Sequence, residues 1–147
     1  MEKIDLIAHK DKKSPITESY RAIRTNLLFG SAGKPLKIIG VTSSTPGEGK
    51  STTSSNLAIV MAQAGKRVLI SDCDLRKPSL QKKFGLANKG LTNYISLGEN
   101  LEDVLNKEVC PNLDVLLSGP IPPNPSELLT SEAMKTLMDQ VKVDYAY

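Results

Sequence analysis

A loop rich in glycine and hydroxyl residues holds the side chains whose types and spacing best suit chemistry. This loop, "VTSSTPGEGKSTTSSN", spans residues 41–56 and lies between an apolar run and a stretch of helical character. Gly47 and Gly49 allow successive backbone N–H groups to turn inward around an anion, and the N-terminal end of the following helix adds positive charge. The loop therefore predicts a site for the phosphates of a nucleotide, which raises the question of where the terminal phosphate goes.

The spacing within the loop supports this interpretation. The phosphate-loop (Walker A) pattern has a small residue, four free positions and then Gly-Lys-Ser/Thr. Gly49, Lys50 and Ser51 close the pattern, whereas Ser44 stands at the place usually taken by glycine. We expect Lys50 to bridge the β- and γ-phosphates of ATP and the Ser51 hydroxyl to ligate Mg²⁺; an ordinary glycine turn is the alternative. The residues expected to bind the nucleotide are Pro46, Gly47, Glu48, Gly49, Lys50, Ser51 and Thr52.

Two carboxylates, Asp72 and Asp74, form a second group of candidate residues within "VLISDCDLRKP". They follow a predicted strand at its C-terminal end, which is the edge where ligands bind in open parallel sheets. Carboxylates two positions apart at such an edge can hold a Mg²⁺ shell and leave one oxygen near an incoming hydroxyl. The alternative is that both acids are solvated and pair with Arg76 and Lys77. We expect Asp72, Asp74 and Lys50 to be catalytic, and Ser51, Asp72 and Asp74 to hold the metal.

Alternating strands and helices are predicted to position these residues. Ser14 can cap a helix from Pro15 to about Phe29, whose apolar residues Ile16, Tyr20, Ile23 and Leu27 recur at helical spacing. The other predicted elements are a strand at Leu36–Ser43, a helix at Ser51–Gln63, a strand at Arg67–Asp72, a helix at Leu101–Asn106, a strand at Leu113–Ser118, a helix from Pro125 to Val141 and the start of a strand within residues 141–147. This order predicts a doubly wound α/β domain with a mostly parallel sheet.

The composition sets further bounds. With 147 residues and 39% hydrophobic content, the chain is expected to form a single domain over residues 1–147, with residues 1–14 as an N-terminal extension. A net charge of +3 is too small to predict a nucleic-acid partner. Only two cysteines occur, which favours a reducing compartment. No apolar run reaches the roughly 18 residues that a membrane-spanning helix needs, so we expect a cytoplasmic location.

Four motifs in order give a more specific indication: "ESYRAIRTN", "SSTPGEGKST", "LISDCDLRKP" and "GPIPPNPSELL". Together they resemble the cytoplasmic bacterial tyrosine kinases (BY-kinases) of capsular and exopolysaccharide synthesis, over about Thr17 to Val141. The resemblance implies a phosphate-loop NTPase fold and an ATP- and Mg²⁺-dependent protein tyrosine (auto)kinase. It also implies that Asp72 activates the tyrosine hydroxyl and touches the Mg²⁺ shell, while Asp74 supports the metal. The terminal phosphate would then pass to a protein tyrosine.

The same resemblance implies partners. Glu18, Arg21 and Arg24 follow i, i+3, i+6 spacing, and in the resembled family this pattern lies at a subunit contact in a homo-oligomeric ring. An intrahelical pair between Glu18 and Arg21 is the alternative. A transmembrane adaptor protein is expected to activate the kinase and to recruit it to the inner face of the cell membrane.

Two other functions stay open at this point. Partitioning and cell-division ATPases of the same superfamily pass the phosphate to water and act as nucleotide switches, but they commonly carry an extra lysine where Thr45 stands here. An inactive nucleotide-binding fragment is the other possibility, because no cluster of terminal tyrosines is present and Tyr145 and Tyr147 are expected to be core residues. We expect the chain to be C-terminally incomplete, truncated before the Walker B strand whose acid completes the Mg²⁺ site, and not competent as a kinase alone.

Overall fold

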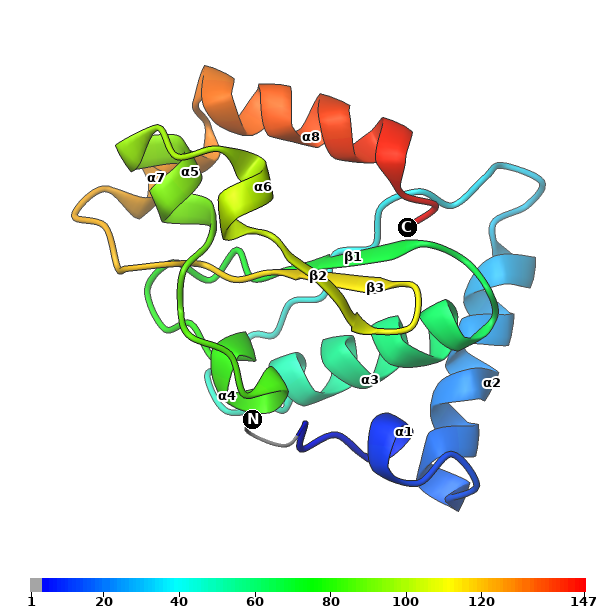
Figure 1. Cartoon of the computed structure of the whole chain (residues 1–147). Coiled ribbons are helices and arrows are strands. Elements are labelled where there is room, and N and C mark those ends of the chain that lie inside the picture. Colours follow the sequence, from blue (N-terminus) through cyan, green and yellow to red (C-terminus); the bar gives the residue numbers. More distant parts are fainter. Residues whose placement is uncertain (1–3) are drawn as a thin grey trace.

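The computed structural model describes residues 4–147 and places a three-stranded sheet between two groups of helices (Figure 1). The strands are β1 (Val68–Ser71), β2 (Asn106–Cys110) and β3 (Leu113–Leu116), in the order β1-β3-β2. The helices are α1 (Ile7–Lys10), α2 (Pro15–Gly30), α3 (Lys50–Gln63), α4 (Leu80–Phe84), α5 (Leu91–Leu97), α6 (Leu101–Val104), α7 (Pro125–Leu129) and α8 (Glu132–Asp144). In Figure 1, α1 to α4 lie on one side of the sheet and α5 to α8 on the other. The predicted α/β class is confirmed.

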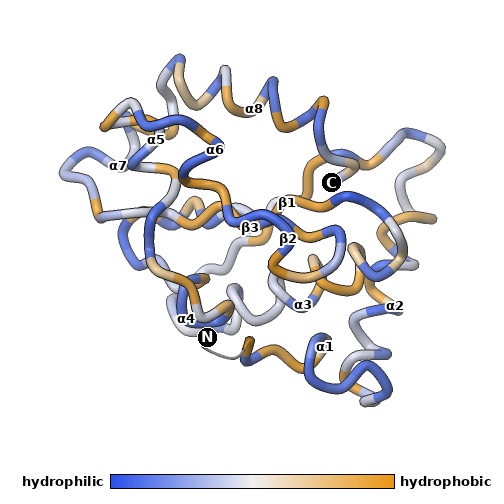
Figure 2. Tube along the Cα trace, in the orientation of Figure 1, coloured by the Kyte–Doolittle hydropathy of each residue, from blue (hydrophilic) through white to orange (hydrophobic). Residues whose placement is uncertain are grey.

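The sheet combines both kinds of strand pairing. β1 and β3 are parallel, with Val68 opposite Leu113, as expected for strands joined by a long connection. β2 and β3 form an antiparallel hairpin, and Asn112 in its turn has a φ of 65°. Residues on the two faces of the sheet belong to two apolar clusters, one with α3 and one with α6, α7 and α8. The hydropathy colouring of Figure 2 shows apolar segments of the chain gathered along these elements.

Helix α2 begins as predicted, but only part of its apolar face packs against the core. Ser14 accepts a hydrogen bond from the Ile16 N–H, and Pro15 occupies the first turn. Tyr20 and Leu27 pack against the core as expected, whereas Ile16 and Ile23 are 57% and 40% exposed. Helical spacing of these four residues therefore predicted the helix, but only two of them pack against the core.

A buried polar residue explains the rotation of α2. Thr17 is fully buried, and its hydroxyl lies 2.7 Å from the Asp11 carbonyl oxygen and 3.3 Å from that of Ile7. A buried hydroxyl needs such a partner, because an unpaired one costs about 1–3 kcal/mol. The segment before α2 thus sets the rotation of the helix.

That N-terminal segment is tied to α3. The Ala8 N–H donates to Asn56 Oδ1 at 3.0 Å, and Gln63 Nε2 donates to the Ala8 carbonyl oxygen, also at 3.0 Å. Leu6 and Ala8 are both buried in the cluster around α3. Residues 4–14 therefore contribute to the packing of the helix that follows the phosphate loop.

The predicted strand at Leu36–Ser43 is wrong: within residues 4–147, this segment joins no strand ladder. Ile38 is 52% exposed, and a cavity of about 630 Å³ is lined both by this segment and by β1. β-branched residues favour extended structure, but a strand forms only where a neighbour supplies hydrogen-bonding groups. No such neighbour lies beside this segment in the described part of the chain.

Two predicted helices end differently from expectation. The helix predicted from Pro125 to Val141 is divided into α7 and α8, because Ser131 caps a new helix by accepting from the Met134 N–H. The helix predicted at Leu101–Asn106 ends at Val104, and Asn106 already belongs to β2. A polar strand such as β2, "NKEVC", lacks the apolar alternation that would have predicted it.

The C-terminal residues run beside β1. Helix α8 continues to Asp144, so the predicted strand start is shorter than expected. The Ala146 N–H donates to the Arg67 carbonyl oxygen, and the Leu69 N–H donates to that of Tyr147. Tyr145 is buried and Tyr147 packs against the α3 cluster, which confirms the prediction that both are core residues.

A polar contact fixes this C-terminal segment. The Tyr145 hydroxyl donates to the buried Asp114 carboxylate of β3, and the Arg67 guanidinium lies 3.6 Å from the same carboxylate and 5.1 Å from the Tyr145 ring centroid. Burial and the neighbouring Asp114 carboxylate raise the pKa of the Tyr145 phenol well above its usual value. The protonated phenol is therefore strongly favoured in the folded chain.

This contact predicts alkaline sensitivity. Above about pH 10, tyrosine ionises in the unfolded chain while folded Tyr145 stays protonated, so the free energy of unfolding should fall as the pH rises. Tyr145→Phe should reduce this fall, and at neutral pH it should lower the free energy of unfolding by about 1–3 kcal/mol because Asp114 loses a donor. Urea unfolding from neutral pH to about pH 11 measures both effects, with Tyr147→Phe as the matched control. A Tyr145→Phe profile parallel to that of the wild type would contradict the assignment.

Candidate functional site

The phosphate loop leads directly into α3. Gly47 and Gly49 have φ values of 79° and 82°, and Gly49 is the residue that precedes the helix. Such left-handed conformations strain any residue with a side chain, so the backbone path depends on glycine at both positions. The path delivers the N–H groups of the first turn of a helix of 14 residues, α3, without a side chain covering them. This geometry suits an anion such as a phosphate.

Two hydroxyl groups form hydrogen bonds within the first half of the phosphate loop. Thr45 and Ser44 both donate to Glu48 Oε1, at 2.6 and 3.3 Å. The Thr45 hydroxyl is the main reason that the pKa of the Glu48 carboxyl is lowered. Ser44, the departure from the usual glycine, thus helps to satisfy a charge within the loop.

Lys50, the first residue of α3, points to the acidic motif that contains Asp72 and Asp74. Its ammonium group lies 3.2 Å from Asp74 Oδ2, and both side chains are about one-third exposed (34%). Burial alone would raise the pKa of the Asp74 carboxyl, but the Lys77 N–H and the Lys50 ammonium group outweigh it, so the pKa lies below its usual value. The alternative pairing with Lys77 is not what the structure has: the ion pair of Asp74 is with Lys50.

Asp72 lies at the end of β1 and is 7% exposed. Its Oδ1 accepts from the Asp74 N–H at 3.0 Å, and its Oδ2 accepts from the N–H groups of Ser79 at 3.0 Å and Leu80 at 3.2 Å. A carboxylate oxygen has two acceptor positions, so Oδ1 retains one and Oδ2 has none left. Asp72 therefore organises the loop to α4 and keeps one acceptor position, on Oδ1, for a ligand.

Ser79 is a contact that sequence reasoning missed. Its hydroxyl is in hydrogen-bond contact with that of Ser51, the predicted metal ligand. In the sequence, Ser79 follows Pro78 and precedes an apolar residue, which is typical of a helix cap and gives no sign of a contact with the phosphate loop. The two motifs therefore meet through Lys50–Asp74 and through Ser51–Ser79.

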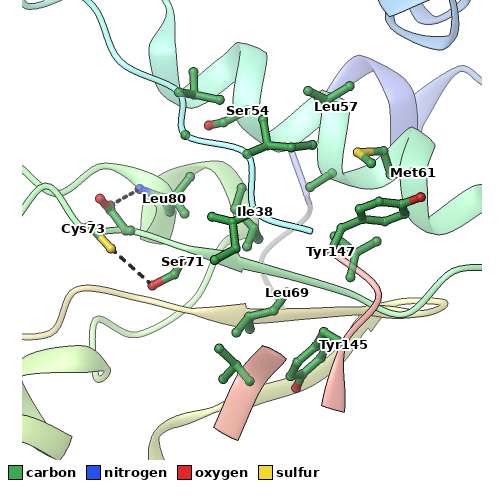
Figure 3. Close-up of a pocket in the computed structure, with 18 of the residues that line it drawn as sticks. Ile38, Ser54, Leu57, Met61, Leu69, Ser71, Cys73, Leu80, Tyr145 and Tyr147 are labelled. Atoms are coloured by element: carbon green, nitrogen blue, oxygen red, sulfur yellow. Dashed lines mark hydrogen bonds between the residues drawn. The ribbon is translucent and has the colours of Figure 1, made fainter. Parts of the chain in front are cut away.

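The cavity beside β1 opens next to these residues. Figure 3 shows Ile38, Leu57, Met61, Leu69 and Tyr147 around it, from the segment after α2, from α3, from β1 and from the C-terminal segment. Lys50, Asp72 and Asp74 also line this cavity, whose volume is about 630 Å³. The remaining predicted nucleotide-binding residues, Pro46 and Thr52, lie in the loop and in the first turn of α3.

The oxygen groups at this site fit Mg²⁺. Residues 4–147 contain no group of three or more His, Cys, Asp or Glu side chains that could enclose a metal by themselves. Mg²⁺ does not need such a group, because it usually takes one or two protein oxygens and completes its shell with phosphate oxygens and water. The Ser51 hydroxyl and the Asp74 carboxylate are donors of the kind it prefers. The one free position on Asp72 Oδ1 can serve either the metal or an incoming hydroxyl, but not both at once.

The three charged residues of α2 make contacts within the chain. Arg21 lies 2.8 Å from Glu18 Oε2 and donates to the Lys12 carbonyl oxygen at 2.6 Å. Arg24 donates to the Val60 carbonyl oxygen of α3 at 2.5 Å. The intrahelical Glu18–Arg21 pair is thus present, and Arg24 is half-buried between two helices.

Comparisons with known proteins give the family. Residues 36–147 match the AAA domain family. The chain is 49% identical over 134 residues to the tyrosine-protein kinase YwqD of Bacillus subtilis, covering 90% of this chain. It is 39% identical over 143 residues to the putative tyrosine-protein kinase CapB of Staphylococcus aureus, covering 97% of this chain. The chain belongs to the bacterial tyrosine-kinase family.

Solved structures of this kinase family have the same fold. The chimerical protein CapA2B2 superimposes with a TM-score of 0.92 at 42% identity, covering 100% of this chain and 65% of that chain. The kinase domain of the Escherichia coli tyrosine kinase ETK also gives a TM-score of 0.92, at 33% identity, covering 99% of this chain and 58% of that chain. The predicted phosphate-loop NTPase fold is confirmed.

The chain spans only part of its relatives. It covers 56% of YwqD and 63% of CapB. Among residues 4–147, no helix is both long enough and apolar enough to cross a bilayer.

The hydrogen bonds of Asp72 predict that its replacement lowers the stability of the fold, separately from any effect on catalysis. Asp72→Ala should lower the free energy of unfolding by about 2–4 kcal/mol, because three backbone N–H groups lose their acceptor. Asp74→Ala is the comparison: the Asp74 carboxylate pairs with Lys50 and also accepts from the N–H groups of Arg76 and Lys77. These contacts are exposed, so water can replace them and the loss should be smaller than for Asp72→Ala. Chemical unfolding without nucleotide measures both. Equal losses for the two variants would contradict the organising role of Asp72.

Proposed function

We propose that this chain is the nucleotide-binding part of an ATP-dependent protein tyrosine kinase that serves capsular or exopolysaccharide synthesis. The observation that carries the proposal is the meeting of the phosphate loop with the acidic motif, at 3.2 Å between Lys50 and Asp74, in a kinase-family fold. The relatives YwqD of Bacillus subtilis and CpsD of Streptococcus agalactiae are also named tyrosine-protein kinases. The bound nucleotide is ATP, with Mg²⁺ beside its phosphates.

The residues of the loop have distinct roles in this proposal. The N–H groups at the start of α3 bind phosphate oxygens, and Lys50 exchanges its pair with Asp74 for a pair with the β- and γ-phosphates. This exchange frees the Asp74 carboxylate to support Mg²⁺ together with the Ser51 hydroxyl. Bound Mg²⁺ neutralises charge on the phosphates. The free position on Asp72 Oδ1 is the acceptor for the proton of the tyrosine hydroxyl.

We further propose that the protein assembles into a ring through α2 and is recruited to the inner face of the membrane by a transmembrane adaptor. The outward apolar residues Ile16, Ile23 and Phe29 support a contact along α2, beside Glu18, Arg21 and Arg24. Because Arg24 also holds α3, an Ile23→Glu variant tests the contact with less effect on folding. Light scattering on an assembling form of the protein should show a lower mass for this variant, and an unchanged mass would count against the contact.

Lys50→Met tests the nucleotide site. This variant should lose Mg-ATP binding by about 100-fold or more, because the loop retains no other cation at the phosphates. Titration of residues 1–147 with a fluorescent ATP analogue measures the loss. Asp74→Asn is the matched comparison: it removes the partner of Lys50 but keeps the cation, so binding without Mg²⁺ should be at least as tight as in the wild type. Unchanged affinity in Lys50→Met would remove the phosphate-loop assignment.

The reaction is tested in the natural protein that contains these residues. With Mg-ATP and a tyrosine-containing acceptor, the wild type should form phosphotyrosine, and Lys50→Met should not. Inorganic phosphate without phosphotyrosine would instead indicate a nucleotide-switch ATPase, and neither product would indicate a binding module.

A further inference from the structure

Ser79 occupies a helix-capping position without acting as a cap. It immediately precedes α4, where a serine hydroxyl usually accepts a hydrogen bond from an N–H of the first helical turn. In the described chain, the Ser79 side chain makes no such bond. Capping therefore does not explain why the hydroxyl is present.

Asp72 performs the capping in its place. The Asp72 carboxylate accepts from the N–H groups of both Ser79 and Leu80, which are the donors at the start of α4. Asp72 is buried at the end of β1, so it holds Ser79 to the rigid edge of the sheet. The hydroxyl of Ser79 is thus both released from capping and fixed in position.

This fixed hydroxyl faces the phosphate loop. It is in hydrogen-bond contact with the Ser51 hydroxyl, in the first turn of α3. A serine hydroxyl has one proton to donate and two lone pairs to offer. If Ser51 donates its proton to Ser79, both of its lone pairs remain available to a cation.

We infer that Ser79 is a positioning residue for the metal-ligating hydroxyl: it accepts the Ser51 proton and orients the Ser51 oxygen toward Mg²⁺. The inference rests on the proposed nucleotide site and extends it to a residue outside both motifs. A cation on the Ser51 oxygen makes its proton a stronger donor, since bound cations increase the acidity of their ligands. The Ser51–Ser79 hydrogen bond is therefore stronger with Mg²⁺ present, and it couples metal binding to the loop held by Asp72.

The first experiment measures the contact without any nucleotide. Ser51→Ala, Ser79→Ala and the double variant form a double-mutant cycle on the unfolding equilibrium of residues 1–147. The coupling should be about fivefold in the equilibrium constant, as for an ordinary hydrogen bond. Additive effects would overturn the inference, whatever the chain binds.

The second experiment measures how much Mg²⁺ increases the affinity for nucleotide. Nucleotide affinity is determined for the fluorescent ATP analogue with Mg²⁺ and with EDTA. In Ser79→Ala, the Mg²⁺-dependent gain in affinity should fall about tenfold, while the affinity in EDTA stays within about twofold of the wild type. Ser79→Thr keeps a hydroxyl and should restore the gain. A full gain in Ser79→Ala, or an equal loss with and without Mg²⁺, would overturn the inference.

Ser131→Ala is the matched control, because Ser131 is a serine that does cap its helix. This variant should lose stability but keep the full Mg²⁺ effect. A wild-type chain that binds no nucleotide would overturn the proposed function and the metal role of Ser79 with it, while the cycle without nucleotide would still decide the contact.

Discussion

The buried carboxylate of Asp72 is the constraint on which the site depends. A charge that is 7% exposed needs compensation, and here the backbone N–H groups of Asp74, Ser79 and Leu80 supply it. In providing that compensation, the loop must wrap back over the end of β1. This path brings Asp74 to Lys50 and Ser79 to Ser51. The geometry that favours nucleotide chemistry is therefore a consequence of satisfying one buried acid.

The sequence was sufficient for the parts of this arrangement that depend on local chemistry. The two glycines, the lysine and the paired acids predicted the phosphate loop and its partner motif, because left-handed turns and strand-end carboxylates have few alternative uses. The role of Asp72 in the loop was not predictable in the same way. It depends on where the N–H groups of Ser79 and Leu80 lie in space, and nothing in "DCDLRKPSL" shows that distance.

The wrong predictions concern segments whose secondary structure depends on contacts with other parts of the chain. Ile38 and its flanking residues have strand-forming side chains, but no ladder forms because no strand lies beside them in the described chain. In α2, the spacing of the apolar residues does not show which face is buried, because the buried Thr17 hydroxyl is paired with the Asp11 carbonyl oxygen and apolar periodicity carries no information on such a contact. Strand β2 was missed for the related reason that pairing with β3, and not its polar sequence, makes it a strand.

Because the segment before the phosphate loop pairs with no strand in the described chain, the position of the loop depends more on the side-chain contacts of the site. In many phosphate-loop folds, the strand before the loop belongs to the sheet, which fixes the loop relative to the strand-end acids. Here the segment before the loop and β1 both line a cavity of about 630 Å³, and the C-terminal segment is hydrogen-bonded to Leu69 of β1 and to Arg67 just before it. The position of Lys50 and Ser51 relative to Asp72 then depends on the packing of α3 and on two contacts, Lys50–Asp74 and Ser51–Ser79. An ion pair that is one-third exposed contributes little alone, so the hydroxyl contact, held by a loop that Asp72 makes rigid, is the more direct connection between the two motifs.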